Sequence, residues 1–241
     1  MTFRSKMLES AERRKSRVVL ALDFSDPYDR RLDRAQKVLD ATKGKVAAVK
    51  LNHHLLLPYG LMGIDGIVRV CKQERLPLIA DLKMNDIEST NVNVVDSLLA
   101  FGFDAVIANP FVGKEEGLGK VVGMLHQREA GIILLVYMSH AGAPEGYGLV
   151  ANTGEPMYRI FARRAREWGA DGVVVSAKDV AKIDETRRIV GGDCLIFSPG
   201  IGPQGGDAQS GAGRGSDFVI VGRSVTEAPD PLRTLRELTR S

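Results

Sequence analysis

Residues 76–86 read Leu-Pro-Leu-Ile-Ala-Asp-Leu-Lys-Met-Asn-Asp, an apolar run that leads into two carboxylates and an ammonium group. The apolar run predicts a buried strand. In a strand, Asp81 and Lys83 project from one face and Leu82 from the other, because side chains alternate. A charge pair on a buried strand is costly unless it is paired and used. We therefore expect catalytic machinery at the end of this strand.

Seven other short apolar runs are similar to this one. They are rich in Val, Ile, Leu or Ala with little polar alternation, as expected of parallel strands that are buried on both faces. The eight predicted strands are Val18–Leu22, Val46–Leu51, Leu76–Leu82, Ala105–Ala108, Ile132–Tyr137, Gly172–Ser176, Cys194–Phe197 and Phe218–Val221. Segments with helical periodicity lie between them, including Leu55–Val70, Val92–Phe101, Met157–Trp168 and Val180–Ile189.

The order of these segments predicts the fold. Eight strand-then-helix units in 241 residues indicate an α/β fold, the (β/α)8 or TIM barrel. No linker-like stretch divides the chain, so we expect one barrel domain over residues 1–241. Residues 1–16 are predicted to add a short surface helix before the first strand. The alternative is an open doubly wound sheet, but Asp23-Phe24-Ser25-Asp26 stands where its glycine-rich turn would follow the first strand.

Composition excludes several classes of protein. With 44% hydrophobic and 26% charged residues the chain is typical of soluble globular proteins. The net charge is only +3 and no basic stripe is interleaved with aromatic residues, so we expect no nucleic-acid partner. Residues 1–16 lack the apolar core of a signal peptide, and no run approaches a membrane span. Cys71 and Cys194 show no ligand or redox spacing, which predicts buried thiols in a reducing compartment and a cytoplasmic protein.

Charged residues stand at the ends of the first three predicted strands, where barrels of this type carry their chemistry. Each has a plainer explanation. Asp23 and Asp86 could cap the helices that follow, and Lys50 could extend to the barrel rim. Asp81 and Lys83 could form a purely structural ion pair. One site explains all five residues together, whereas the plainer explanations require five coincidences at one end of the barrel.

These charges indicate a class of reaction. A lysine flanked by carboxylates keeps its proton, because opposite charges favour the ammonium form. Such a lysine is poorly suited to Schiff-base chemistry and well suited to deliver a proton to a carbanion. Asp81 beside it disfavours a second negative group on the substrate at the same place. An array that repels a carboxylate and protonates the carbon left behind fits a decarboxylase, although this inference is not unique.

The motif Asp81-Leu-Lys83-Met-Asn-Asp86-Ile87, with Thr90 four residues beyond Asp86, resembles the signature of the orotidine 5′-phosphate decarboxylase family. The similarity runs in the same order from Val18 to Arg236. Further similar segments are Leu22-Asp23, Val49-Lys50, Met138-Ser139-His140, Pro199-Gly-Ile-Gly-Pro-Gln-Gly-Gly-Asp207 and Val221-Gly222-Arg223-Ser224. Glu88-Ser89 replaces the more usual Pro-Glu after Ile87, which leaves the start of the next helix open.

The resemblance implies a role for each residue in decarboxylating orotidine 5′-phosphate to uridine 5′-phosphate, a step of de novo pyrimidine biosynthesis. Lys83 would protonate C6 of the pyrimidine as carbon dioxide leaves, and Asp81 would lie against the substrate carboxylate. Lys50 would bridge Asp81 and the ribose hydroxyls, and Asp23 would bind the ribose. Ser139 would hydrogen-bond the pyrimidine edge. No cofactor is expected.

The resemblance also implies a homodimer with shared active sites. Asp86 and Thr90 would reach the ribose side of the neighbouring subunit's site, and Ile87 between them belongs to the same substrate-binding set. Asp86 would then be a catalytic residue of the partner's site. The segment from Asp81 to Asp86 is therefore predicted to serve two sites.

The substrate phosphate is expected at the loops after strands 7 and 8, the usual phosphate site of this fold. Glycines allow close backbone approach there, and Gly222-Arg223 offers N–H groups and a guanidinium that can bind phosphate through two hydrogen bonds. The alternative is a glycine-rich surface turn with a solvated arginine. The resemblance adds Gln204 as a side chain that reaches over the phosphate. The expected contacts are Pro199, Gly200, Gln204, Gly205, Gly222 and Arg223.

Two other functions remain open. The 3-keto-gulonate 6-phosphate decarboxylases and hexulose phosphate synthases share the Asp-x-Lys-x-x-Asp signature and use magnesium, which they bind with an acidic residue on strand 2. This chain has Lys50 there, and a second cation beside Lys83 opposes Mg²⁺ binding. The four histidines show no zinc-ligand spacing either, so we expect no metal. A non-catalytic phosphate-binding barrel would lack part of the charge array, and no part is missing.

Overall fold

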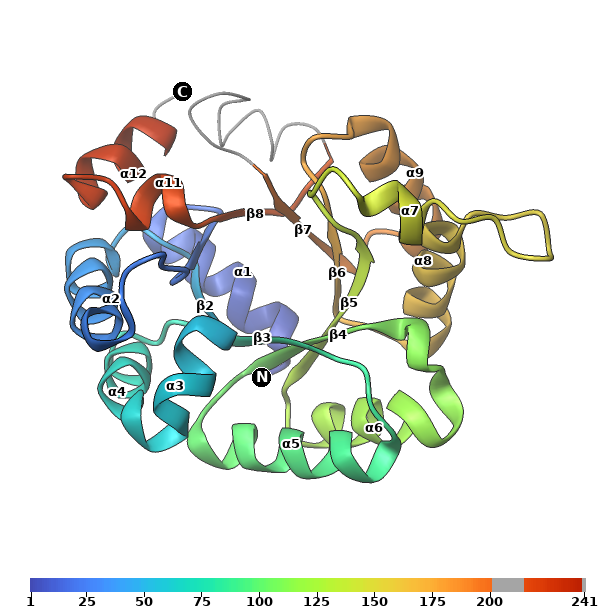
Figure 1. Cartoon of the computed structure of the whole chain (residues 1–241), viewed down its shortest axis with the longest axis horizontal. Coiled ribbons are helices and arrows are strands. Elements are labelled where there is room, and N and C mark those ends of the chain that lie inside the picture. Colours follow the sequence, from blue (N-terminus) through green and yellow to red (C-terminus); the bar gives the residue numbers. More distant parts are fainter. Residues whose placement is uncertain (201–214, 240–241) are drawn as a thin grey trace.

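The strands close into a barrel (Figure 1). The computed structural model describes residues 1–200 and 215–239. Eight parallel strands pair in chain order, and β8 pairs with β1. They are β1 Val18–Ala21, β2 Ala48–Asn52, β3 Leu78–Met84, β4 Ala105–Ala108, β5 Gly131–Tyr137, β6 Gly172–Val175, β7 Leu195–Pro199 and β8 Phe218–Val221. The predicted (β/α)8 barrel is confirmed, and the open sheet is excluded because each of these strands has a neighbour on both sides.

Helices occupy the connections and surround the barrel (Figure 1). They are α1 Phe3–Arg14, α2 Tyr28–Thr42, α3 His53–Gly63, α4 Asp65–Gln73, α5 Glu88–Phe101, α6 Gly119–Gln127, α7 Ala143–Tyr147, α8 Met157–Trp168, α9 Val180–Val190, α11 Arg223–Thr226 and α12 Pro231–Thr239, with short turns η1 Pro110–Val112 and η2 Lys114–Leu118. The predicted helix over Met157–Trp168 is confirmed as α8. The open start of the helix after Ile87 is settled as well, because α5 begins at Glu88.

The segment Leu55–Val70 is helical, as predicted, but it is not one continuous helix. The segment forms α3 and α4, which meet at an angle of 88°. Gly60 has φ +61° inside α3 and breaks the helical path two residues after Pro58, whose ring removes a backbone donor. No single helix of the described chain is long and apolar enough to cross a membrane; α3 and α4 reach that length and composition only as this bent pair.

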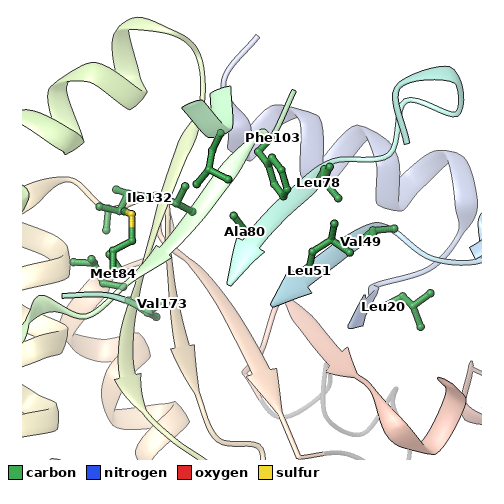
Figure 2. Close-up of a cluster of buried hydrophobic side chains, with 14 of the residues drawn as sticks. Leu20, Val49, Leu51, Leu78, Ala80, Met84, Phe103, Ile132 and Val173 are labelled. Carbon is green, nitrogen blue, oxygen red and sulfur yellow. The ribbon is translucent and has the colours of Figure 1, made fainter. Parts of the chain in front are cut away.

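The side chains of the strands alternate between two apolar clusters. The outer cluster fills the space between strands and helices, and Figure 2 shows part of it, including Leu20, Val49, Leu78 and Ile132. The inner cluster fills the barrel with residues of the opposite phase, such as Val19. Because side chains two apart on a strand share a face, the same alternation decides which polar residues face the barrel axis.

The N-terminal helix is not the surface helix that its mixed charges predicted. The side chains of Phe3 and Met7 belong to the inner cluster, and α1 crosses the barrel behind the strands in Figure 1. Ser10 Oγ donates to the carbonyl of Ala47, just ahead of β2. Lys6 pairs with an acid just ahead of β4, at 2.8 Å. The helix therefore closes the N-terminal end of the barrel. Its buried apolar residues are four positions apart and form a narrow stripe, which the surrounding charged residues hide in the sequence pattern.

Phe3→Ala is expected to destabilise the protein by about 3–5 kcal/mol, the usual cost of deleting a large buried side chain. Phe3 is fully buried and stacks near Phe197 at a ring separation of 6.4 Å. The measurement is the urea unfolding midpoint, with Leu149→Ala at an exposed position as the control. Equal midpoints for the two variants would show that α1 does not support the barrel.

Both cysteines are buried and free, as predicted. Burial raises the pKa of the Cys71 thiol to about 12 and has the same effect on the Cys194 thiol, whose pKa also lies at about 12. Both side chains therefore stay protonated at neutral pH and contribute to packing instead of reacting as thiolates.

Candidate active site

Four charged side chains form a continuous row at the C-terminal ends of β1, β2 and β3. Lys50 Nζ lies 2.7 Å from Asp81 Oδ2 and 3.5 Å from Asp23 Oδ1, and Lys83 Nζ lies 2.8 Å from Asp81 Oδ1. We call these four residues the charge array. Lys50 and Asp81 are 4% and 6% exposed, whereas the Lys83 side chain keeps 35% of its surface open. Lys83 is thus the member of the array best placed to meet a substrate.

The alternation of the strands turns the array toward the barrel axis. Ile79 belongs to the inner cluster, and Asp81 lies two residues further along β3. The strand then becomes irregular, since its register with β4 shifts between Ala80 and Met84, and Lys83 has φ +48°. A non-glycine residue in this conformation costs about 1–3 kcal/mol and persists where the surroundings hold it. The predicted contact between Asp81 and Lys83 is present, but an irregular strand makes it.

Burial and charge have opposite effects on the two buried members. Burial alone would raise the pKa of Asp81, but the ammonium groups of Lys50 and Lys83 outweigh it and hold the pKa below its usual range. Burial alone would lower the pKa of Lys50, but the carboxylates of Asp81 and Asp23 outweigh it and hold the pKa above its usual range. Asp81 and Lys50 are therefore both charged at neutral pH, each stabilised by the other.

Asp23 supplies an acceptor that the protein leaves free. Its Oδ1 atom is buried, and it accepts no hydrogen bond from the residues that the structure describes. The Lys50 ammonium makes an ionic contact with it at 3.5 Å, longer than the roughly 2.7–3.2 Å of a usual hydrogen bond. Buried polar atoms nearly always have a hydrogen-bond partner, so this oxygen indicates where a ligand's donor can bind.

The C-terminal ends of β5 and β7 lie at the same end of the barrel as this row. Gly200 directly follows β7 with φ +103°, and a Cβ atom at this position would lie 3.5 Å from the Cβ of Ser139, which follows β5. Pro199 is the last residue of β7. The structure therefore brings Ser139 next to the Pro199-Gly200 segment. Gln204 and Gly205 lie outside the described residues.

The turn after β8 lies next to the first member of the array. A Cβ atom on Gly222 would lie 3.4 Å from Asp23 Oδ2, which is van der Waals contact, so the turn lies directly against this carboxylate. Arg223 begins α11 and is exposed. We call Gly222 and Arg223 the β8 turn. The position of this turn fits a ligand that spans from the array to the loops after β7 and β8.

Asp86, Ile87 and Thr90 are not brought into the charge array. All three are exposed, and Ile87 keeps 62% of its surface open although it is apolar. Asp86 Oδ1 accepts a hydrogen bond from the Ile87 amide at 2.7 Å, whereas Ile87 occupies the N-cap position of α5. Asp86 is therefore not the helix cap that the plainer explanation required.

Two residues outside the predicted site, Thr226 and His54, hold the Asp23 loop in place. Thr226 is fully buried, and its hydroxyl donates to the Asp23 carbonyl at 2.8 Å. On the other side of the loop, the Phe24 amide donates to His54 Nδ1 at 3.2 Å. Sequence spacing contained no signal for either contact, because each joins segments that are 30 or 203 positions apart and meet only in the folded barrel.

The carboxylates of the array, which could otherwise bind a metal ion, already pair with an ammonium group of the chain itself. Lys50 lies between the carboxylates of Asp23 and Asp81, at the place where a divalent ion would have to bridge them. Within residues 1–200 and 215–239, no three His, Cys, Asp or Glu side chains gather in a way that could hold a metal ion.

Comparison with known proteins identifies the family. A sequence model described as the orotidine 5′-phosphate decarboxylase / HUMPS family matches residues 16–238. The chain belongs to this family. Among curated members of the orotidine 5′-phosphate decarboxylase / HUMPS family, it is 34% identical to the orotidine 5′-phosphate decarboxylase of Methanosarcina acetivorans, over 92% of each chain. It is 35% identical to that of Pyrococcus abyssi, over 92% of this chain and 96% of the relative.

Solved structures of family members have the same fold. The orotidine 5′-phosphate decarboxylase from Pyrococcus horikoshii OT3 superposes with a TM-score of 0.75 at 31% identity, covering 92% of this chain and 96% of that one. The orotidine 5′-monophosphate decarboxylase from Methanocaldococcus jannaschii, complexed with the inhibitor BMP, gives a TM-score of 0.77 at 25% identity, with coverages of 94% and 99%. The similarity to family members extends over nearly the whole barrel.

Proposed function

We propose that this chain decarboxylates orotidine 5′-phosphate to uridine 5′-phosphate in pyrimidine biosynthesis, without a metal or cofactor, as one barrel domain in the cytoplasm. The observation that carries the proposal is the buried Asp81 carboxylate held between two ammonium groups, Lys50 at 2.7 Å and Lys83 at 2.8 Å. Family membership supports orotidine 5′-phosphate as the substrate, and the charge array supports decarboxylation as the reaction.

In this mechanism the bond between C6 and the carboxylate breaks, carbon dioxide leaves, and the electron pair stays on C6. Lys83 donates a proton to C6 and recovers one from solvent, to which its side chain is open. Asp81 places a fixed negative charge beside the departing carboxylate. Because Lys50 holds Asp81 from the buried side, the charges are in position before substrate binds, which is the arrangement that favours electrostatic catalysis.

The remaining contacts orient the nucleotide. The free Oδ1 atom of Asp23 suits a ribose hydroxyl, since it is a buried acceptor with no other donor in the described chain. We assign the pyrimidine edge to Ser139, which lies beside Gly200. The phosphate is assigned to Pro199, Gly200 and the β8 turn, and to Gln204 and Gly205, so that remote binding energy assists the reaction at C6.

The deciding experiment follows the orotate-ring absorbance during incubation with orotidine 5′-phosphate, with and without a chelator. We expect loss of absorbance that the chelator does not change. No reaction with this substrate would reject the proposal, and turnover of 3-keto-gulonate 6-phosphate that requires magnesium would assign the chain to the sister activity. Sensitivity of the orotidine 5′-phosphate reaction to the chelator would overturn its metal independence.

We further propose a homodimer in which Asp86, Ile87 and Thr90 complete the partner's site. Their exposure supports this, because none of them contributes to the charge array of its own chain. Exposed apolar side chains lie on the segments that follow the neighbouring strands β2, β3 and β4, and would be covered in such a dimer. They are Leu57, Met62, Ile87 and Phe111.

Shared sites give a distinctive expected result. Lys83→Met and Asp86→Ala are each expected to inactivate a homodimer, but a heterodimer of the two variants has one site with both defects and one with neither. Differently tagged subunits, co-expressed and purified through both tags, should therefore have about half of the parental activity per dimer. An inactive heterodimer would place Asp86 in its own subunit's site.

Arg223→Ala is expected to lower kcat/KM for orotidine 5′-phosphate by about 10- to 100-fold, since a hydrogen bond to a charged group contributes roughly 1.5–3 kcal/mol. Orotidine, which lacks the phosphate, should be turned over as by the parent. Arg233→Ala, which removes an exposed arginine paired with Glu237 on α12, is the control. A similar loss on both substrates would show that Arg223 does not bind the phosphate.

A further inference from the structure

The loop that carries Asp23 is joined to the segment behind the β8 turn by a network of side chains. Thr226 ends α11, and its hydroxyl donates to the Asp23 carbonyl at 2.8 Å. The amide of Thr226 in turn donates to the carbonyl of Gly222 at 3.0 Å. A single buried threonine thus touches both the expected phosphate turn and the residue that approaches Lys50.

Arg34 of α2 fastens the same two segments from the outer side. Its Nε atom donates to the Thr226 carbonyl at 3.1 Å, and its Nη1 atom lies 3.1 Å from Asp26 Oδ1 in the loop of Asp23. Arg31 adds a hydrogen bond from its Nε atom to the Asp26 carbonyl at 2.6 Å. We call Thr226 and Arg34 the clasp.

We propose that the clasp couples phosphate binding at the β8 turn to the position of Asp23 in the charge array. The inference rests on the proposed function and adds two positioning residues to it, neither of which touches the substrate. When a phosphate orders Gly222 and Arg223, the first turn of α11 is ordered with them, and the Thr226 hydroxyl carries this constraint to Asp23.

The hydrogen bond from Thr226 matters for the position of Asp23, because the ion pair between Asp23 and Lys50 is long. The distance from its Oδ1 atom to Lys50 is 3.5 Å, longer than a usual hydrogen bond, so the position of the backbone helps to hold the carboxylate. Phe24 is tied to His54 on one side of the loop, and Thr226 supplies the hold on the side of the phosphate. Small displacements matter at such a place, since a misplacement of about 1 Å can cost roughly 100-fold in rate.

A purely structural role for Thr226 makes a different prediction. If the hydroxyl only stabilised the fold, its loss would affect the reactions of orotidine 5′-phosphate and orotidine equally. If it transmits phosphate binding, its loss should affect only the substrate that carries a phosphate. The ratio of the two kcat/KM values therefore separates the roles.

The test compares Thr226→Val, which keeps the shape and removes the donor, with Thr226→Ser, which keeps the donor. For Thr226→Val we expect kcat/KM for orotidine 5′-phosphate to fall about tenfold or more while that for orotidine changes less than about twofold, and Thr226→Ser should restore the parental ratio. Thr186→Val is the matched control, because Thr186 is also fully buried and its hydroxyl has no hydrogen-bond partner in the described chain.

Arg34→Met is a second variant that weakens the clasp. Because the Arg34 side chain is partly exposed, this variant should fold even if Thr226→Val does not. It should lower the same ratio. Parental ratios in the folded variants, or equal losses on both substrates, would overturn the coupling. The parental enzyme is assayed first, so failure of the proposed function appears as absent turnover of orotidine 5′-phosphate, before any variant is compared.

Discussion

Lys83→Met is expected to lower kcat for orotidine 5′-phosphate by about 10⁴-fold, the upper end of what a positioned proton donor contributes. The substitution keeps the length and most of the volume of the side chain and removes the proton that C6 requires. Asp81 retains Lys50 as a partner, so the buried carboxylate stays ionised. The loss should therefore arise in the chemical step, with substrate binding much less affected.

Single-turnover kinetics combined with a substrate-binding titration measure this difference. Lys43→Met is the control, because Lys43 pairs with Asp40 and Glu74 at the other end of the barrel, away from the array. The control should match the parent in rate and affinity. Activity of Lys83→Met within about tenfold of the parent would assign the proton to another group.

Lys50→Met is expected to damage both stability and activity. Removing one partner of a buried ion pair leaves an uncompensated charge, which costs on the order of 3–5 kcal/mol. Here Asp81 loses its 2.7 Å partner, and the free carboxylate of Asp23 loses the only cation near it among the described residues. A loss of fixed charge in the site should also lower kcat by about 10²- to 10³-fold.

Urea unfolding of three variants tests this account. Lys83→Met should unfold near the parental midpoint, because its side chain is one-third exposed. Lys50→Met should unfold much earlier, and adding Asp81→Asn to Lys50→Met should recover part of the loss, since the buried charge is then gone. A double variant no more stable than Lys50→Met would show that packing, and not charge, explains the effect.

The pKa directions in the array also set the pH range of its contribution to stability. The pKa of Asp81 is lowered, so this contribution is complete above the ordinary carboxyl pKa of about 4 and is lost as the pH falls through the folded value. The pKa of Lys50 is raised, so its contribution is complete below the ordinary ammonium pKa of about 10 and is lost as the pH rises through the folded value. The ion pairs of Asp81 and Lys50 therefore contribute fully to stability between about pH 4 and about pH 10.

The barrel and the array were predictable from sequence because both depend on local patterns. The apolar run before Asp81 predicts a buried strand, and the spacing of Asp81 and Lys83 predicts their contact. Lys50 and Asp23 follow from the rule that chemistry gathers at the C-terminal ends of barrel strands. These predictions required only the order of the strands, which is confirmed.

Other features depend on which distant segments meet, and the sequence pattern does not contain this information. The left-handed conformation of Lys83 arises where β3 changes register against β4, and nothing in its neighbours marks it. Thr226 contacts Asp23 across 203 positions of sequence. The break at Gly60 was open to prediction, because a proline and a glycine stand within three positions of each other in the expected helix.

The closure of the barrel by α1 has a practical consequence for handling the enzyme. The first residue lies at the end of the barrel opposite the charge array, and its amino group forms an exposed ion pair with Glu129. Such a pair contributes little to stability, so a tag attached there disturbs little. Immobilisation on a sensor surface through the amino terminus should therefore direct the charge-array end of the barrel away from that surface, which suits surface-based measurement of nucleotide binding.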